Sequence, residues 1–563
     1  MKTTDKNSVR QLASLLVSYG VSTVVMSPGS RNAPLLVAFE RQPEIETHMV
    51  IDERSAGFIA LGMADAKSEP IALVCTSGTA PLNYAPAVAE AYYRKIPLIV
   101  ITADRPYEWI DQDDSQTIIQ PGIYANYIKG TFDIPVDSDD PDRKWYVNRA
   151  LNDALTLATQ GNQGPVHINV RIAEPVGRVV DVDNLPVRNI STRVTYNYPQ
   201  YEFTVFSHDI VDSKGVLIII GFLSSKDAGL VFDLNKLARL PNVVVLHEAQ
   251  ANLHGCGEGY IPNIDATLSC LPADVPEPDI VITIGGALTS RMIKEKVRSM
   301  QNVKHWSICQ SDHSVDCFRH LDWHFNAAPF YVLNSLVETI DTIDKDMTPT
   351  EFKQVWLQAS EDAKIKSKKF AENAPWSDFK AMNYIMTHLP ESYNLQLSNG
   401  TAVRYAQLFE YSHLARIFCN RGVSGIDGCT STAIGFSLFN EKPTVLISGD
   451  MSFQYDIGAL ATTFIPRNFK IVVLSNGGGG IFRFIAATRH LDEVEKCFAG
   501  PVNLPLKALA EAYGMNYYCA DNEEVLPDTF ALWLNENDAP SILEIKTDGQ
   551  ISAEIITNFF KTK

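Results

Sequence analysis

The nine cysteines of this 563-residue chain include no Cys-x-x-Cys pair, and no histidine cluster has the spacing of a zinc site. The sequence therefore predicts neither a zinc module nor a disulfide framework. Reduced, mostly buried thiols are the simplest interpretation, and they favour a cytoplasmic protein. The longest apolar runs, such as 216–220, have strand length and are far too short for a membrane span. Residues 1–20 lack the apolar core of a signal peptide and read as an amphipathic helix.

Basic charge is also scarce, because the formal net charge is −18 at pH 7. Such a chain has no general attraction for nucleic acid or for an anionic membrane surface, so the sequence predicts neither partner. Local basic pockets for small anions remain compatible with it. A complete Gly-x-Gly-x-x-Gly fingerprint is missing too. Gly285-Gly286 follows a predicted strand, and a plain strand-to-helix turn explains this pair better than a dinucleotide site does.

The sequence does contain enough apolar material for several cores. Apolar residues make up 45% of the chain, and its length suggests about three or four domains of ~150 residues each. Three blocks alternate apolar runs with amphipathic stretches, which predicts an α/β protein with three doubly wound, mostly parallel sheets. We predict domains at 1–175, 205–345 and 377–563, with a linker near 175–200 and a polar helix within 349–373. The first and third blocks look like variants of one design.

The predicted strands of the first block are 21–26, 49–52, 71–76, 98–102 and 166–170. Those of the second are 215–220, 243–247 and 279–284, and those of the third are 417–420, 444–448, 471–475 and 541–545.

Two polar motifs follow neighbouring apolar runs in the third block. Gly449-Asp450-Met451-Ser452 comes after the run 444–448, and Asn476 with a four-glycine tract comes after 471–475. If these runs are parallel strands joined by a crossover helix, both polar residues lie at the sheet edge where ligands bind. Asp, Asn and glycine carbonyl oxygens suit Mg²⁺, and the glycines let the backbone approach a diphosphate. A mobile glycine loop after a common Gly-Asp turn is the alternative interpretation.

A second acidic junction, Asp52-Glu53, lies near the N-terminus between an apolar run and a small-residue helix. Taken alone, a carboxylate at a helix N-terminus is ordinary, because the helix dipole favours it.

Together the two signals resemble the thiamine diphosphate enzymes, which use one glutamate in this strand-to-helix context against the cofactor's pyrimidine ring. Finer matches occur in order: Ser27-Pro28-Gly29-Ser30-Arg31, Asp52-Glu53-Arg54, Thr102-Ala103-Asp104-Arg105-Pro106 and Asn420-Arg421-Gly422-Val423-Ser424-Gly425-Ile426-Asp427-Gly428. This set resembles the 2-succinyl-5-enolpyruvyl-6-hydroxy-3-cyclohexene-1-carboxylate synthase family of menaquinone biosynthesis. The resemblance covers the first and third blocks well and the middle block thinly.

The resemblance implies a transferase that decarboxylates 2-oxoglutarate and adds the four-carbon fragment to isochorismate, using thiamine diphosphate and Mg²⁺ or Mn²⁺. It implies a pyrimidine-binding first domain and a diphosphate-binding third domain. It also implies a homodimer or homotetramer with active sites between subunits.

The same resemblance assigns residue roles. Glu53 is the implied catalytic residue, because it would hydrogen-bond the pyrimidine nitrogen, and Ile426 would support the bent cofactor from below. The implied cofactor-binding set is Glu53, Ser77, Gly425, Ile426, Asp450, Met451, Ser452, Asn476, Gly478, Ile481 and Phe482, with Asp450, Asn476 and the Gly478 carbonyl on the metal. Isochorismate is assigned to Ser30, Arg31, Arg105, Gln116 and Arg291, and the 2-oxoglutarate carboxylate to Arg404 and Arg421. Arginine suits these dicarboxylates because its fork stays charged and binds bidentately.

Four positions depart from the family pattern and put the substrate contacts in question: Ser115, Gly400, Met292 and Gly477. Three other readings stay open at this stage. They are another thiamine diphosphate enzyme with a monocarboxylate donor, a non-catalytic protein of the same fold, and a Rossmann-type oxidoreductase. The arginine loops argue against the first, intact Glu53, Asp450 and Asn476 against the second, and the missing fingerprint against the third.

Overall fold

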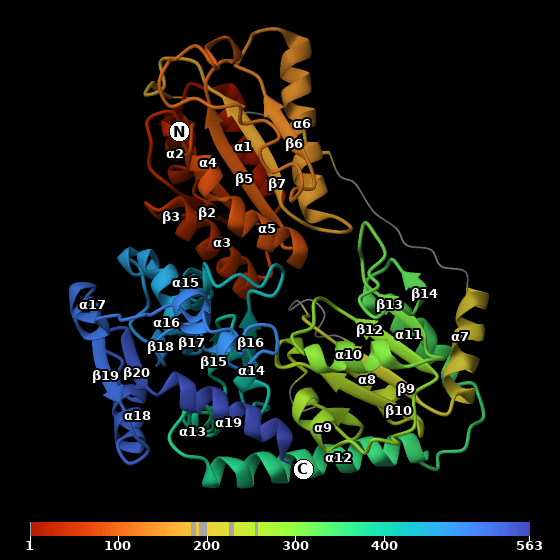
Figure 1. The fold of residues 1–563 in the computed structure, drawn as a ribbon. Coiled ribbons are helices and arrows are strands. Elements are labelled where there is room, and N and C mark those ends of the chain that lie inside the picture. Colours follow the sequence, from red (N-terminus) through yellow and green to blue (C-terminus); the bar gives the residue numbers. More distant parts are fainter. Residues whose placement is uncertain (1, 182–186, 191–199, 224–229, 254–256, 563) are drawn as a thin grey trace. The chain divides into compact units, whose positions relative to one another are not determined.

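The computed structural model describes residues 2–181, 187–190, 200–223, 230–253 and 257–562. These residues form three six-stranded sheets with helices on their faces (Figure 1). The strand orders are β3-β2-β4-β5-β7-β6, β11-β10-β9-β12-β13-β14 and β16-β15-β17-β18-β20-β19, and all neighbouring strands in them are parallel. The predicted α/β class with parallel, doubly wound sheets is confirmed. The first and third sheets also share one strand order, in agreement with the expectation that the first and third blocks are variants of one design.

The first sheet is covered on both faces. Its strands are β2 (Thr23–Met26), β3 (Glu46–Met49), β4 (Ile71–Cys75), β5 (Leu98–Asp104), β6 (Thr131–Ile134) and β7 (Val166–Arg171). Helices α1 (Asn7–Ser18), α2 (Ala33–Glu40) and α6 (Pro141–Thr159) pack on one face. Helices α3 (Glu53–Lys67), α4 (Ala80–Asn83) and α5 (Ala85–Arg94) pack on the other. Side chains along β4 alternate between the two cores, as the pleat requires.

Two predictions in this region are wrong in their bounds. The strand expected at 49–52 ends at Met49, because Asp52 caps α3 and its carboxylate accepts the Arg54 amide at 3.0 Å. The N-terminal helix begins only at Asn7, since β1 (Lys2–Thr4) pairs antiparallel with β8 (Val179–Asp181) inside the expected linker. The linker residues 182–186 and 191–199 lie outside the described residues.

The second sheet has the strand order of dinucleotide-binding domains. Its strands are β9 (Val216–Ile220), β10 (Val243–His247), β11 (Tyr260–Ile261), β12 (Ile280–Ile284), β13 (Lys304–Ile308) and β14 (Leu321–Phe325). Its helices are α7 (Gln200–Asp212), α8 (Val231–Ala238), α9 (Ile264–Cys270), α10 (Arg291–Ser299), α11 (Pro329–Ile340) and α12 (Glu351–Asn373). At the switch point the Gly286 amide donates to the Phe222 carbonyl at 2.8 Å, and a Cβ at Gly221 would lie 2.3 Å from the Gly286 oxygen. Backbone therefore fills this crevice, which supports the plain-turn interpretation.

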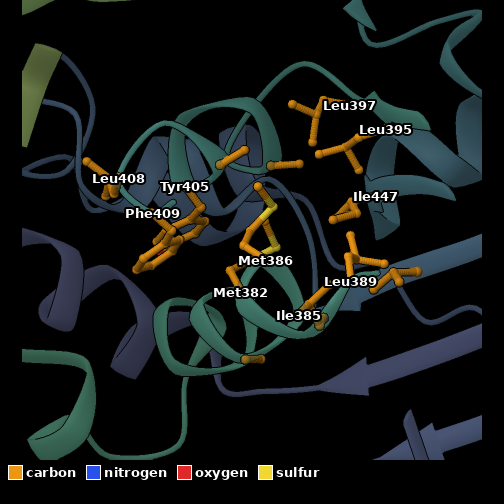
Figure 2. Close-up of a cluster of buried hydrophobic side chains, with 14 of the residues drawn as sticks. Met382, Ile385, Met386, Leu389, Leu395, Leu397, Tyr405, Leu408, Phe409 and Ile447 are labelled. Carbon is orange, nitrogen blue, oxygen red and sulfur yellow. The ribbon is translucent and has the colours of Figure 1, made fainter. Parts of the chain in front are cut away.

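The third sheet carries the glycine-rich motifs. Its strands are β15 (Asn394–Leu397), β16 (Arg416–Cys419), β17 (Thr444–Gly449), β18 (Lys470–Ser475), β19 (Asn516–Ala520) and β20 (Ser541–Lys546). Its helices include α13 (Asp378–His388), α14 (Ala402–Ala406), α16 (Asp450–Tyr455), α17 (Leu506–Ala512), α18 (Leu526–Leu534) and α19 (Gly549–Lys561). Figure 2 shows one side of its core, where Met382, Ile385 and Met386 of α13 gather with side chains of β15 and β17. Burying each such side chain stabilises the fold by about 1.5–3 kcal/mol.

Several strands escaped prediction, namely β1, β6, β8, β11, β13, β14, β15 and β19. These elements are short or carry polar side chains, such as the Lys-His-Trp-Ser-Ile run of β13, so neither alternation nor an apolar run marks them. Of the helices that the structure describes, none has both the length and the apolar character needed to cross a bilayer.

Contacts divide the chain into two compact units. The first comprises 1–195, 422–441 and 455–466, and the second comprises 196–421, 442–454 and 467–563. All strands of the second and third sheets belong to the second unit. The three domain ranges given by the sequence each enclose one sheet, and their boundaries stay a proposal.

Within the first unit, α3 packs backbone to backbone against α15 (Cys429–Ser437). A Cβ at Gly62 of α3 would lie 1.9 Å from the Thr432 carbonyl oxygen, and one at Gly435 would lie 2.0 Å from the Ile59 oxygen. The small residues of α3 therefore allow its backbone to approach that of α15 closely.

We expect Gly62→Ala to lower the free energy of unfolding by ~1–3 kcal/mol, because an extra methyl group forces two backbones apart. The higher helix propensity of alanine, about 1 kcal/mol, offsets only part of this. The shift of the urea unfolding midpoint, followed by circular dichroism, measures the effect. Gly177→Ala is the matched control, since no described atom lies within 4 Å of its Cβ position. Equal midpoints for both variants would contradict the packing argument.

Candidate functional site

Asp450 and Asn476 lie at the same edge of the third sheet, as the sequence predicts. They directly follow β17 and β18, which pair in parallel with Gly449 opposite Leu474. The connection between these strands begins with α16, of which Asp450 is the first residue. Because the strand order reverses between β15 and β17, Asp450 also lies at the switch point where open α/β sheets bind ligands.

The Asp450 carboxylate holds the glycine tract in place. Its Oδ2 accepts hydrogen bonds from the Gly477 amide at 2.9 Å and the Gly478 amide at 3.0 Å, and its Oδ1 accepts from the Met451 amide at 2.7 Å. Burial raises the pKa of Asp450 to about 6, against the lowering effect of these hydrogen bonds. The group is therefore mainly ionised at neutral pH, and a buried charge of this kind is stabilised by a nearby cation.

Asn476 and Gly478 offer two neutral oxygens beside this carboxylate. The Asn476 Nδ2 donates to the Asp378 carboxylate at 2.6 Å, whereas its buried Oδ1 has no hydrogen-bond partner among the described residues. Gly478 has φ +134°, and a Cβ there would lie 2.3 Å from the Gly500 oxygen, so only glycine fits. Its carbonyl accepts the Gly480 amide at 2.9 Å and keeps a second lone pair. One carboxylate and two neutral oxygens fit a hard divalent cation.

The remaining residues assigned to the diphosphate end surround this loop. Met451 and Ser452 form the first turn of α16, and Ile481 and Phe482 lie in η5 (Gly480–Arg483). Arg483 donates to the Asn476 carbonyl at 3.3 Å and to the Gly477 carbonyl at 3.4 Å, and forms two hydrogen bonds of 2.9 Å with Glu495. Sequence reasoning missed this brace, because a lone arginine resembles a solvated charge.

Glu53 is the first residue of α3 in the first unit, just after the cap Asp52. Its carboxylate is only half-buried, and desolvation raises its pKa above the usual value, while a hydrogen bond with Asn83 acts in the opposite direction. Such a carboxylate holds or releases a proton more readily near neutral pH than an exposed glutamate does. Nearby, Ser77 and Gln116 join two loops: the Ser77 hydroxyl donates to the Gln116 carbonyl, and the Gln116 amide donates to the Ser77 carbonyl, both at 3.0 Å.

The loop that contains Gly425 and Ile426 also belongs to the first unit. It is irregular, as predicted, and Ile426 is half-buried in it. The buried Glu90 of α5 anchors it, accepting hydrogen bonds from the Gly422 amide at 2.8 Å and the Val423 amide at 2.7 Å. Glu90 escaped the sequence analysis. Its position as a single glutamate on the apolar side of a predicted helix was the one feature of the sequence that could have indicated a buried role.

Arg31 and Arg105 follow β2 and β5, and each meets a carboxylate of its own chain. The buried Arg31 donates to the Ile172 carbonyl at 3.0 Å and pairs with Glu174 at 2.9 Å. Arg105 pairs with Asp114 at 2.5 Å. Glu174 and Asp114 are partly exposed, so both guanidinium groups are placed to receive carboxylates. Ser30 is exposed next to Arg31.

Arg404 and Arg421 lie in the second unit and influence each other's charge. The buried Arg421 donates to the Asn399 side-chain oxygen at 2.9 Å, and Arg404 donates to the Gly400 carbonyl at 2.5 Å. Burial lowers the pKa of Arg404, the charge of Arg421 lowers it further, and Asp265 and Glu248 act against both. The fully buried Glu248 accepts hydrogen bonds from the Thr289 amide at 2.8 Å and the Ser290 amide at 2.7 Å, so the middle sheet supplies the balancing charge. Sequence reasoning missed Glu248 and Asp265.

Arg291 is much more exposed than the other arginines assigned to the substrates. It begins α10, its side chain is 75% exposed, and it pairs with Glu295 one turn later at 2.6 Å. Its assignment to isochorismate stays a prediction.

Comparison with known proteins places both ends of the chain in one enzyme class. Residues 6–123 match the thiamine pyrophosphate enzyme N-terminal TPP binding domain, and residues 399–545 match the corresponding C-terminal TPP binding domain. The two matches contain Glu53 and Asp450, which supports thiamine diphosphate as the cofactor.

Full-length relatives narrow the class. A 2-succinyl-5-enolpyruvyl-6-hydroxy-3-cyclohexene-1-carboxylate synthase from Porphyromonas gingivalis is 38% identical over 99% of this chain and 97% of its own length. Synthases of that name from Flavobacterium psychrophilum and Bacteroides thetaiotaomicron are 38% and 32% identical, over 96% and 99% of this chain and 96% and 98% of their own lengths. Similarity of this extent includes the middle block, where sequence motifs were weak. The chain therefore belongs to the 2-succinyl-5-enolpyruvyl-6-hydroxy-3-cyclohexene-1-carboxylate synthase family of thiamine diphosphate enzymes.

Proposed function

We propose that this chain joins 2-oxoglutarate to isochorismate with loss of CO₂, giving 2-succinyl-5-enolpyruvyl-6-hydroxy-3-cyclohexene-1-carboxylate for menaquinone biosynthesis. The full-length similarity to synthases of that name carries the proposal. Thiamine diphosphate, when bound, supplies the electron sink that a 2-oxoacid needs to lose CO₂. The protein's part is to bind, orient and hold protons and charges.

In this proposal Glu53 holds a proton shared with a nitrogen of the cofactor's pyrimidine ring, which its raised pKa suits. Ile426 supports the cofactor with an apolar surface. Asp450, the Asn476 Oδ1 and the Gly478 carbonyl hold Mg²⁺ or Mn²⁺, because they form an all-oxygen donor set with one charge. The other residues assigned to cofactor binding are Ser77, Gly425, Met451, Ser452, Ile481 and Phe482.

The arginines divide the two substrates between them. Arg404 and Arg421 receive the remaining carboxylate of 2-oxoglutarate, and the buried Glu248 keeps the two like charges together. Arg31 and Arg105, with Ser30 and Gln116, receive isochorismate, whose carboxylates replace Glu174 and Asp114 as partners.

This division predicts distinct losses. Removing a cation that pairs with a buried carboxylate costs ~2–5 kcal/mol, because the partner charge is left unmatched. Arg404→Ala should therefore impair donor consumption with 2-oxoglutarate alone, whereas Arg31→Ala and Arg105→Ala should leave that half-reaction nearly intact and raise the KM for isochorismate. Stopped-flow spectroscopy without acceptor, followed by steady-state kinetics, separates these effects. Arg143→Ala, at an exposed position of α6, is the control. A block of the half-reaction in Arg31→Ala but not in Arg404→Ala would overturn the division.

We also propose a homodimer or homotetramer with active sites between subunits. Large apolar side chains stay exposed close to the site elements of the first unit: Ile51, two residues before Glu53, is 80% exposed, and Tyr93 and Tyr127 lie with ring centroids 6.3 Å apart on its surface. A second copy would bury them, because large exposed apolar patches on a folded protein typically mark interaction surfaces. A cytoplasmic location stays a prediction.

The decisive experiment measures CO₂ release from 2-oxoglutarate with and without isochorismate, thiamine diphosphate and Mg²⁺. We expect full turnover only with all four components. Efficient turnover of pyruvate in place of 2-oxoglutarate would point to another 2-oxoacid carboligase, and no CO₂ release from either acid would exclude the proposed reaction.

A further inference from the structure

The Asn476 side chain meets two very different surroundings at its two ends. Its Nδ2 donates a 2.6 Å hydrogen bond to Oδ2 of Asp378, a residue that is 1% exposed. Its Oδ1 is buried and has no donor within reach among the residues that the structure describes. A buried amide oxygen without a partner costs free energy, and a cation bound at this oxygen would offset that cost.

An asparagine amide has two orientations, and Asp378 distinguishes them. Both carboxylate oxygens of Asp378 accept hydrogen bonds, Oδ1 from the Thr547 hydroxyl and Oδ2 from Asn476, so Asp378 pairs with the NH₂ end of the amide and not with its oxygen. With the NH₂ end held on Asp378, the oxygen is left for a cation. The reverse orientation would turn an NH₂ group toward the cation and lose the ligand.

Asp378 is itself held from several sides. Thr547 donates its hydroxyl to Oδ1 at 2.5 Å, and the Asp378 amide donates to the Ser552 hydroxyl at 3.0 Å. Asp378 also begins α13, whose apolar side packs into the core of the third sheet (Figure 2). The fold therefore fixes the position of the Asp378 carboxylate, and the Asn476 side-chain amide orients toward it.

We infer that Asp378 is a positioning residue of the metal site, which fixes the Asn476 amide with its oxygen free for the cation. The inference rests on the proposed metal-binding role of Asp450, Asn476 and Gly478. Outer carboxylates that orient metal ligands typically contribute ~10–100-fold in metal affinity. Among the described residues, Asn476 is the one assigned ligand to which Asp378 is hydrogen-bonded. The charge of Asp378 also acts on Asp450, so the orienting effect is the part of its contribution that passes through Asn476.

The test uses Asp378→Asn in the full-length protein, because asparagine can both donate and accept and so no longer selects one amide orientation. We expect Mn²⁺ to bind ~10–100-fold more weakly in the presence of thiamine diphosphate, as measured from the electron paramagnetic resonance signal of free Mn²⁺. The same substitution at Asp548, which caps α19 by accepting the Gln550 and Ile551 amides, is the matched control and should change the affinity less than twofold.

A double-mutant cycle decides whether the effect passes through Asn476. In an Asn476→Ala background, Asp378→Asn should cause a clearly smaller loss of Mn²⁺ affinity, because only the effect of its charge on Asp450 remains. An unchanged affinity in Asp378→Asn alone, or an equal loss in both backgrounds, would overturn the inference. If Asp378→Asn fails to fold, Thr547→Val takes its place. It removes one support of the carboxylate and should weaken Mn²⁺ binding beyond the Asp548→Asn control, and an affinity equal to that control would contradict the inference.

The outcome also separates this inference from the proposed site. If the wild-type protein with thiamine diphosphate binds no Mn²⁺, the assigned metal ligands are wrong and the inference falls with them. If the wild type binds Mn²⁺ and Asp378→Asn binds it equally well, only the positioning role is wrong.

Discussion

Glu53→Gln is expected to slow turnover by ~10²–10⁴-fold, the usual contribution of general acid–base catalysis. The amide has nearly the shape of the carboxylate but cannot exchange a proton with the pyrimidine ring. The half-buried position and raised pKa of Glu53 suit that exchange. Because Glu53 is the first residue of α3 and its side chain is only half-buried, the fold and most of the cofactor affinity should survive.

Steady-state CO₂ release from 2-oxoglutarate measures the loss, and calorimetry with thiamine diphosphate and Mg²⁺ checks that the cofactor still binds. Asp52→Asn is the matched control, because it neutralises the adjacent carboxylate and asparagine still caps α3. Near-normal turnover in Glu53→Gln, or an equal loss in Asp52→Asn, would contradict a specific role of Glu53 in proton exchange with the cofactor's pyrimidine ring.

Asp450→Ala should nearly abolish metal-dependent binding of thiamine diphosphate. It removes the single charged ligand of the proposed cation, and losing one partner of a buried ion pair costs ~3–5 kcal/mol, or roughly a hundredfold or more in affinity. It also frees the Gly477 and Gly478 amides, which the carboxylate holds at 2.9 and 3.0 Å. Asn476→Ala removes only a neutral oxygen and should weaken binding less.

Titration calorimetry of thiamine diphosphate with Mg²⁺ orders these variants. Asp456→Asn serves as the control: Asp456 is also a buried aspartate whose pKa burial raises to about 6, but its carboxylate accepts from the Ser431 amide and hydroxyl and is not an assigned metal ligand. Wild-type affinity in both Asp450→Ala and Asn476→Ala would refute the metal site.

Local patterns in the chain were sufficient for the class of fold and the family, and they indicate which residues we propose to bind the cofactor. The motif around Asp450 is readable because its strands are continuous apolar runs that end at a polar residue, and parallel strands bring such ends to one edge. The irregular loop around Ile426 can be predicted for a similar reason, since glycines lie close to it on both sides in the sequence. These features depend on neighbours in sequence, which a single chain displays.

Only the tertiary structure showed what holds those residues. Asp378 and Asn476 are 98 positions apart, and Glu90 and Gly422 are 332 apart, so no local pattern connects them. The likeness in strand order between the first and third sheets, and the charge that Glu248 supplies to Arg404, likewise arise only after the chain has folded. The motifs that suggest cofactor binding consist of residues that are neighbours in sequence. The groups that position them are ordinary carboxylates, whose roles come from burial and from partners that folding brings within hydrogen-bond distance.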